Sequence, residues 1–347
     1  MRTTQACTSH GQIALEREDI ARRELRPDDI AIRVDYCGVC HSDLHAIHDH
    51  DPQSAMPLVP GHEFTGTVTE IGEQVKNLRV GDVVAVGNIV DSCRECDMCL
   101  AGQENFCRKF PTLTYGGADR IDGTATLGAF AREYVVREEF AYLLPEGLDP
   151  AAAAPLMCAG VTVWEPLRAM NVGSGTRVAV VGLGGLGHLA VKLAVALGAD
   201  TTVISRTADK AEDVERLGAQ RLLLSTDEAA MAEARGQFDV ILDTVAVNHA
   251  LAPYLSLLAL DGELCLLGYL GEVSVAVTDL LIGRKKLSSA GSGGRRRTAE
   301  LLAFCAKHQV VAEVEVLPST RVEESLERLA RGDVRYRFVL DMSDLDD

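Results

Sequence analysis

Cysteine and histidine residues stand in this sequence where they could ligate a metal ion. Cys40 is followed by His62, and Cys158 lies much farther along the chain. Two sulfurs and one nitrogen would leave the fourth position of a zinc ion open, which is the pattern of a catalytic rather than a structural zinc. Ser42 and His45 stand beside Cys40. Their hydroxyl and imidazole groups could pass a proton from a zinc-bound alcohol to solvent.

Two acidic residues adjoin these candidate ligands. Asp43 and Glu63 could anchor the ligands from behind, and Glu63 could instead bind the metal directly. Spacing alone does not join Cys40, His62 and Cys158, because a buried cysteine is often only a small apolar residue. That simpler interpretation stays open for four other cysteines, Cys7, Cys37, Cys265 and Cys305.

Four more cysteines form a compact cluster at Cys93, Cys96, Cys99 and Cys107. Thiolates so close together can complete a tetrahedron around one zinc and leave no open position, which is typical of a structural site. Disulfides or an iron–sulfur cluster are the alternatives. The zinc-like chemistry nearby favours zinc. We expect the loss of one ligand to reduce stability more than chemistry.

The composition excludes several classes of protein. The 347 residues suggest two domains, and the net charge of −17 argues against DNA, RNA or an anionic membrane as partner. The apolar stretch 178–199 contains His188, Lys192 and a glycine cluster, so it fits a strand, a turn and a helix better than a membrane span. Ten cysteines without a secretion signal favour metal ligation over disulfides. We expect a soluble cytoplasmic protein.

The pattern of the chain changes near residue 151. Before it, short β-rich runs such as 29–36, 66–71 and 82–86 are separated by turn residues, as in a compact barrel. After it, strands and helices alternate, which predicts a parallel sheet. The expected helices are 156–170, 188–197 and 210–217, and the expected strands are 177–181, 201–205, 239–243 and 263–267. A last segment, with an expected helix 298–308 and an expected strand 337–341, could complete either domain.

A glycine-rich turn follows the expected strand 177–181. Gly182, Gly184 and Gly187 form a GxGxxG pattern that follows an apolar strand and opens a helix, the context required of a dinucleotide-binding turn. The pyrophosphate of a cofactor would meet the helix start there. The candidate contacts are Gly182, Leu183, Gly184, Gly185, Leu186 and Gly187.

The end of the second strand of this region favours NADP over NAD. Ser205, Arg206 and Lys210 stand there, whereas the first acid, Asp209, comes later in the turn. A hydroxyl and two cations suit a 2′-phosphate. The alternative is that the cations are solvated charges at a helix start. The basic run 291–297 is either a flexible crossover loop or a phosphate contact.

The chain resembles the zinc-dependent medium-chain alcohol dehydrogenases, specifically the cinnamyl alcohol dehydrogenase branch. The resemblance implies an α/β fold with a GroES-like β-barrel catalytic domain and a Rossmann, doubly wound NADP-binding domain. The catalytic domain would comprise 1–157 and 292–347 and hold both zincs, and the Rossmann domain would span 158–291. The similar segments are 37–45, 60–66, the four-cysteine cluster, 155–164, the glycine turn and 332–339.

The family pattern assigns roles to individual residues. It implies that Cys40, His62 and Cys158 bind the catalytic zinc, with Glu63 behind them, and that Ser42 and His45 form the proton relay. His41 would lie near the cofactor pyrophosphate, Thr162 beside the nicotinamide, and Ser205, Arg206 and Lys210 at the 2′-phosphate. A homodimer paired through the cofactor domains is also implied.

The sequence departs from the family near the relay. Several members carry an acid where this chain has His50, and the stretch 49–56 lacks a frequent tryptophan. This stretch, Trp164 and the region of Tyr115 are expected to frame the substrate pocket. His48 and His50 are interpreted as residues of a solvated loop.

These features together predict an enzyme that reversibly reduces aromatic or aliphatic aldehydes to primary alcohols with NADPH, using two zinc ions per chain. The alternatives on the same fold are a polyol or secondary-alcohol dehydrogenase and a reductase of conjugated alkenes or iminium ions. Ser42 and His45 together argue against an alkene reductase, which does not need such a relay. A non-catalytic NADPH-binding or zinc-storage protein is a further alternative, and zinc content would separate it from the enzyme.

Overall fold

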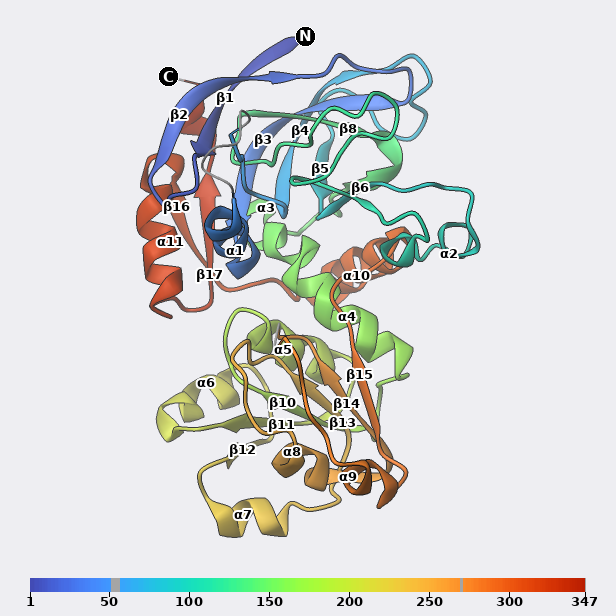
Figure 1. Cartoon of the computed structure of the whole chain (residues 1–347), viewed down its shortest axis with the longest axis vertical. Coiled ribbons are helices and arrows are strands. Elements are labelled where there is room, and N and C mark those ends of the chain that lie inside the picture. Colours follow the sequence, from blue (N-terminus) through green and yellow to red (C-terminus); the bar gives the residue numbers. More distant parts are fainter. Residues whose placement is uncertain (51–56, 269–270, 347) are drawn as a thin grey trace. The chain divides into compact units, whose positions relative to one another are not determined.

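The computed structural model describes residues 1–50, 57–268 and 271–346. The chain divides into two compact units (Figure 1). The first comprises Met1–Cys158 and Gly293–Asp347, and the second comprises Ala159–Ser292. Within the described ranges, no helix combines the length and the apolar character needed to cross a bilayer.

The first unit is built on a mainly antiparallel sheet with the order β16-β17-β3-β4-β5-β9, to which β8 adds by pairing with β3. Ile30, Ile32 and Val34 of the long strand β3 are fully buried in the core of this unit. They lie on one face of the sheet because residues two positions apart on a strand point to the same side. The strands of this sheet are β3 (Asp29–Val39), β4 (Phe64–Ile71), β5 (Val83–Val86), β8 (Glu133–Arg137), β9 (Ala141–Leu143), β16 (Val314–Pro318) and β17 (Arg337–Asp341).

Smaller elements complete this unit. A separate hairpin forms at the N-terminus, and another short strand pair borders the cysteine cluster. The additional strands are β1 (Arg2–Ser9), β2 (Leu15–Arg22), β6 (Ile89–Asp91) and β7 (Thr112–Leu113). The helices are α1 (His41–Asp49), α2 (Asp97–Leu100), α3 (Pro150–Ala153), α10 (Arg295–His308) and α11 (Val322–Ala330).

The C-terminal segment joins the sheet begun by the N-terminal part. Strand β17, near the C-terminus, lies in the same unit as β3 (Figure 1). It pairs antiparallel with β3, so that Phe338 lies opposite Val39. The expected strand 337–341 is thus confirmed. Of the two alternatives for 291–297, a flexible loop or a phosphate contact, the first does not hold for the last three residues, because helix α10 already begins at Arg295. The Arg295 backbone N–H donates to the buried carboxylate of Glu104 at 2.8 Å, which satisfies a donor at the start of this helix.

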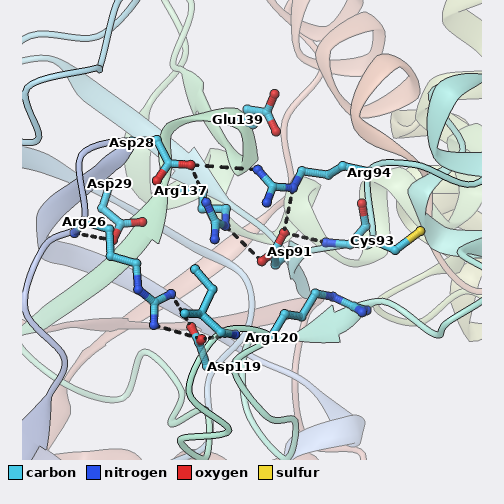
Figure 2. Close-up of polar contacts among 12 residues, drawn as sticks. Arg26, Asp28, Asp29, Asp91, Cys93, Arg94, Asp119, Arg120, Arg137 and Glu139 are labelled. Carbon is cyan, nitrogen blue, oxygen red and sulfur yellow. Dashed lines mark hydrogen bonds and ion pairs between the residues drawn. The ribbon is translucent and has the colours of Figure 1, made fainter.

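Charged side chains attach the four-cysteine loop to the sheet (Figure 2). Arg137 on β8 is buried and donates from Nε to Asp91 at 2.9 Å. It also pairs with Asp28. Arg94, inside the cysteine loop, lies 3.7 Å from Asp91 and 3.9 Å from Asp28. The carboxylates of Asp28 and Asp91 therefore bridge the loop and the strand.

The second unit contains a six-stranded parallel sheet with the order β12-β11-β10-β13-β14-β15. The order reverses between β10 and β13, which makes their carboxyl ends the topological switch point where ligands of this fold bind. The strands are β10 (Arg177–Val181), β11 (Asp200–Ser205), β12 (Arg221–Leu224), β13 (Phe238–Asp243), β14 (Leu258–Leu266) and β15 (Lys286–Ser289). The helices are α4 (Ala159–Ala169), α5 (Gly187–Ala196), α6 (Ala211–Arg216), α7 (Glu228–Glu233), α8 (Ala252–Leu257) and α9 (Val277–Leu281).

The predicted parallel sheet and α/β class are therefore confirmed. The apolar run of β10 is buried in the sheet centre, as expected of a strand covered on both faces. The helix expected at 156–170 begins only at Ala159, because a 3-10 turn, Ala154–Met157, precedes Cys158.

Candidate active site

Asp43 organises the first group of candidate ligands. It lies in the first turn of α1, and its side chain is fully buried. One carboxylate oxygen accepts the backbone N–H of Cys40 at 2.9 Å, and the other accepts that of Gly61 at 3.0 Å. The second oxygen also lies 3.0 Å from Nδ1 of His62. A carboxylate on Nδ1 orients the imidazole and leaves Nε2 for a metal.

The ligand atoms of Cys40, His62 and Cys158 converge on one point. The Cys40 and Cys158 sulfurs lie 4.0 Å apart, and His62 Nε2 lies 3.3 Å from the Cys158 sulfur. Zinc–sulfur bonds of about 2.3 Å at a tetrahedral angle place two sulfurs about 3.8 Å apart, so this set fits a zinc ion. The hydrogen bond between the thiols also holds the pKa of Cys40 well below its usual value. This favours the thiolate, which is the form that binds metal.

A buried ion pair lies behind this set. Glu63 is fully buried, and its Oε1 accepts a hydrogen bond from Arg337 Nη2. Its Oε2 has no hydrogen-bond partner among the residues that the structure describes. Burial raises the pKa of Glu63 to about 7, although the charge of Arg337 opposes this rise. A side chain at Gly38 would place its Cβ 2.3 Å from Oε1, so only glycine leaves room for this carboxylate.

The four-cysteine cluster forms a separate, closed site. The Cys99 sulfur lies 3.8 Å from that of Cys93 and 3.5 Å from that of Cys96. The backbone N–H of Cys93 donates to the Cys107 sulfur, and that of Cys96 donates to the Cys93 sulfur, both at 3.4 Å. Such N–H groups stabilise thiolates. The sulfur spacing again fits one tetrahedral zinc, here with all four positions taken by protein.

The glycine turn in the second unit has the geometry expected of a phosphate-binding turn. Gly182 has a φ of +87°, a conformation that favours glycine. A Cβ on Gly187 would lie 2.2 Å from the carbonyl oxygen of Gly182, so this glycine permits the close packing of turn and helix. A Cβ on Gly184 would meet no atom within 4 Å. The turn is therefore open on the side where a pyrophosphate would approach.

Polar groups follow at the end of the neighbouring strand β11. Ser205 is half-buried at this end, and its Oγ accepts the backbone N–H of Thr207 at 3.4 Å. Arg206 is exposed directly after it, and Lys210 ends a short 3-10 turn before α6. Both cations thus come from the segment that leaves β11 at the carboxyl edge of the sheet.

Comparison with known proteins identifies the family. The family model described as "Alcohol dehydrogenase GroES-like domain" matches residues 26–146, and that described as "Zinc-binding dehydrogenase" matches residues 185–307. The chain is 43% identical over 338 residues to "Probable formaldehyde dehydrogenase AdhA" of Bacillus subtilis, covering 97% of each chain. The chain belongs to the zinc-dependent alcohol dehydrogenases.

Two further members of the family support the branch. The chain is 45% identical over 333 residues to "NADP-dependent alcohol dehydrogenase C 1" of Mycolicibacterium smegmatis, covering 95% of each. A solved cinnamyl alcohol dehydrogenase from Sorghum bicolor matches with a TM-score of 0.93 and 38% identity, covering 98% of each chain. The resemblance to the cinnamyl alcohol dehydrogenase branch, the GroES-like and Rossmann fold and the zinc-dependent oxidoreductase class are thereby confirmed.

The predicted relay residues of this alcohol dehydrogenase lie on helix α1, which begins directly after Cys40. Ser42 and His45 are exposed on α1, and the Ser42 hydroxyl lies 3.7 Å from the Cys40 sulfur. His41 is on the same helix. Thr162 lies on α4 of the second unit, where its hydroxyl donates to the Gly291 carbonyl at 3.0 Å. The roles of these residues remain predictions.

The structure describes part of the predicted substrate pocket. Positions 51–56 of the expected pocket loop lie outside the described residues. Tyr115 packs edge-on against His62, with ring centroids 5.6 Å apart. It therefore borders a candidate zinc ligand. Trp164 is buried on α4 of the second unit.

Two residues that support the open site, Arg337 and Gly38, were not predicted from the sequence. A signal for Arg337 existed, because an arginine inside the otherwise apolar run 337–340 must find a buried partner. Gly38 gave no such signal. Only the structure shows that the Glu63 carboxylate occupies the space a side chain would need.

Proposed function

We propose that this alcohol dehydrogenase reversibly reduces aldehydes to primary alcohols with hydride from NADPH. The observation that carries the proposal is the three-ligand set of Cys40, His62 and Cys158, which leaves a metal position open beside the Ser42 hydroxyl. The names of the relatives agree with this chemistry, since they include a formaldehyde dehydrogenase and a cinnamyl alcohol dehydrogenase.

The choice of NADPH is supported by the end of β11. Ser205 and the cations Arg206 and Lys210 offer one hydroxyl and two positive charges there, and no acid stands at the strand end. An Asp or Glu at this place would bond the ribose 2′-hydroxyl of NAD, whereas arginine forks onto a phosphate. A relative covering 95% of the chain is named NADP-dependent.

Different residues of the first unit would orient the metal ligands and transfer the proton. When bound, zinc would polarise the aldehyde carbonyl, and the reduced nicotinamide would supply hydride. Asp43 orients His62 and holds the Cys40 backbone, so the ligands are placed before substrate arrives. Ser42 would donate its proton to the oxygen of the reduced product. His45, one turn along α1, would return a proton from solvent to Ser42.

We further propose a homodimer formed through the second units. Strand β15 lies at the edge of the six-stranded sheet, and an unpaired edge invites pairing with a second copy. Large apolar side chains are exposed nearby in sequence, namely Val277, Leu281 and Ile282, at 77%, 70% and 72%. Light scattering coupled to size exclusion would report the mass, and a monomer would contradict this proposal.

A cytoplasmic location is proposed as well. All ten cysteines lie in the described part of the chain, and none of them forms a disulfide. Reduced thiols available for zinc fit a reducing compartment.

The test of function follows the loss of reduced-nicotinamide absorbance with aromatic and aliphatic aldehydes, using NADPH and NADH in parallel. We expect fast oxidation of NADPH only. Faster oxidation of NADH would overturn the cofactor assignment, and no turnover by a protein holding two zincs per chain would overturn the reaction.

The relay is tested by Ser42→Ala and His45→Gln. Loss of general acid catalysis typically costs a hundredfold or more, so we expect kcat to fall roughly 100-fold in Ser42→Ala with both zincs retained. His48→Gln is the matched control, because His48 is also exposed on α1 but one turn farther from Ser42. Unchanged turnover in Ser42→Ala would exclude the relay.

A further inference from the structure

The segment that carries Tyr115 is fixed on its N-terminal side. Thr114 is fully buried, and its backbone N–H donates to the Asn88 carbonyl at 3.0 Å. The Thr114 hydroxyl donates to the Gly87 carbonyl at 2.6 Å, and the Thr114 carbonyl accepts the hydroxyl of Tyr134 at 2.9 Å. Three hydrogen bonds therefore hold the backbone directly before Tyr115.

The same segment is also held after Tyr115. The backbone N–H groups of Gly116 and Gly117 donate to the carbonyl and the hydroxyl of Thr126, at 3.3 and 2.9 Å. In return, the Thr126 N–H donates to the Gly117 carbonyl at 2.9 Å. A side chain is positioned precisely when the structure around it locks its place. Tyr115 is thus half-buried on a segment that is bonded on both sides.

The bonds of this segment also lead to a second ligand of the open site. Gly87, which accepts the Thr114 hydroxyl, packs against the residue before Cys158. A Cβ on Gly87 would lie 2.7 Å from the Met157 carbonyl oxygen, so only glycine permits this approach. The segment of Tyr115 is therefore tied to the chain that presents Cys158.

The ring of Tyr115 packs against the imidazole of His62. The two ring centroids lie 5.6 Å apart and the planes meet at 69°, inside the range of about 4.5–7 Å in which aromatic pairs attract each other edge to face. Asp43 alone, bonded at Nδ1, would leave the imidazole able to tilt about the axis of that bond. Because Nε2 lies off this axis, a tilt would move it relative to the Cys158 sulfur, which lies 3.3 Å away. The Tyr115 ring opposes the tilt.

We propose that Tyr115 is a positioning residue of the open metal site, whose ring fixes the plane of the His62 imidazole. The proposal rests on the zinc ion of the proposed function and deepens it, because it adds a residue that holds a ligand without binding the metal. Asp43 holds His62 through a hydrogen bond and Tyr115 holds it by packing, so the imidazole is constrained in two directions. A ligand held in this way binds metal without first losing freedom.

The test compares zinc affinity in variants that keep or lose the ring. Competition with a chelator on the full-length protein measures the affinity of each zinc. We expect Tyr115→Leu to weaken the more weakly held zinc about tenfold, the lower end of the effect typical of residues that orient a metal ligand. Tyr115→Phe keeps the ring and should keep the wild-type affinity. A loss in Tyr115→Phe as large as in Tyr115→Leu would overturn the role of the ring.

The matched control is Tyr142→Leu. Tyr142 is also half-buried in the first unit, on β9, so this variant removes a similar ring from the same unit. It should leave the affinities of both zincs unchanged, whatever its effect on the melting temperature. A role of Tyr115 in core packing alone would make Tyr115→Leu behave like this control, and that result would overturn the proposal.

A second readout is the absorption spectrum of Co²⁺ bound in place of zinc at the open site. The visible bands of Co²⁺ depend on the arrangement of its ligands. They should shift in Tyr115→Leu and match the wild type in Tyr115→Phe. Tyr115→Met fills more of the space of the ring and should shift the bands in the same way, so it replaces Tyr115→Leu if that variant does not fold.

The outcomes separate this inference from the proposed function. A wild type that holds only the zinc of the closed site would overturn the metal chemistry of the proposed function. A wild type with two zincs, together with unchanged affinity and unchanged Co²⁺ bands in Tyr115→Leu, would overturn only the present inference. A wild type that holds two zincs but reduces no aldehyde would overturn the proposed reaction, while weaker zinc binding in Tyr115→Leu would still support the positioning role.

Discussion

The two zinc sites of the first unit are assembled in opposite ways. The closed site takes all its ligands from the single stretch Cys93–Cys107, and backbone N–H groups of the same loop bond two of its sulfurs. The open site collects Cys40 from the start of α1, His62 from the segment before β4, and Cys158 from the segment before α4. The ligands of the closed site are therefore brought together within one local loop, whereas those of the open site are brought together by the tertiary fold.

The charged residues around the two sites also differ, in how deeply they are buried. Buried carboxylates support the open site, with Asp43 on His62 and Glu63 paired with Arg337. The closed site is bordered by partly exposed ion pairs, such as Asp97 with Arg108, whose side chains are 56% and 63% exposed. Exposed pairs contribute little to stability, so we expect metal binding to stabilise that loop together with the buried pair of Arg137 and Asp91. The comparison predicts that damage to the open site impairs chemistry and damage to the closed site impairs folding.

The largest expected effect is on chemistry, from Cys158→Ser. Zinc polarisation supplies several kcal/mol of transition-state stabilisation, and each 1.36 kcal/mol is a factor of ten, so kcat/KM should fall roughly a thousandfold. Zinc content should fall from two ions per chain to one, and the melting temperature should change little. A large drop in melting temperature would contradict the comparison.

The corresponding substitution of a ligand in the closed site is Cys99→Ser. Because metal binding to such a loop is coupled to its folding, the free energy of unfolding should fall by several kcal/mol, as measured by urea denaturation. The molecules that remain folded should keep near-normal kcat. A variant with normal stability and lost activity would reverse the assigned roles.

A smaller effect is expected from Asp43→Asn. Loss of a carboxylate behind a ligating histidine typically weakens metal binding 10- to 100-fold, and here the amide NH₂ would also face the Cys40 N–H. Competition with a chelator would measure the affinity of the more weakly held zinc. Asp97→Asn is the control, since Asp97 lies exposed at the closed site and should leave the open site unchanged.

The smallest effect concerns the ion pair of Arg26 with Asp119 in the first unit (Figure 2). Burial raises the pKa of Asp119, but hydrogen bonds from Arg26 and backbone N–H groups outweigh this and bring it to about 2. A carboxylate with a lowered folded pKa stabilises the protein above its unfolded pKa, and this contribution disappears as pH falls toward 2. Asp119→Asn should therefore cost about 1 kcal/mol at pH 7.

This difference between wild type and Asp119→Asn should begin to shrink below about pH 4, the ordinary pKa of aspartate. Urea denaturation at several pH values would measure it. Asp122→Asn serves as the control, because this partner of Arg26 is 45% exposed and should matter less. A constant difference from pH 7 to pH 3 would exclude the titration of Asp119 as the cause.

Much of the fold was predictable because it depends on local patterns. The apolar run 177–181 and the glycines after it predicted β10 and its turn, and strand 337–341 was also correct at both ends. Helix starts were less predictable, since α4 begins later and α10 earlier than expected. The start of α10 depends on Glu104, a residue distant in sequence that accepts the N–H of Arg295.

The sequence by itself determined the closed metal site, the glycine turn and the alternation of strands and helices, because neighbours along the chain define each of them. It also contained the ligands of the open site, which the family resemblance joined although their spacing could not. Only the tertiary structure decided that Asp43 bonds His62, that Arg337 reaches Glu63 and that Gly38 leaves room for that carboxylate. The Arg337 contact depends on the position of β17, which pairs with β3 in a register set by the packing of the whole sheet and not by local pattern.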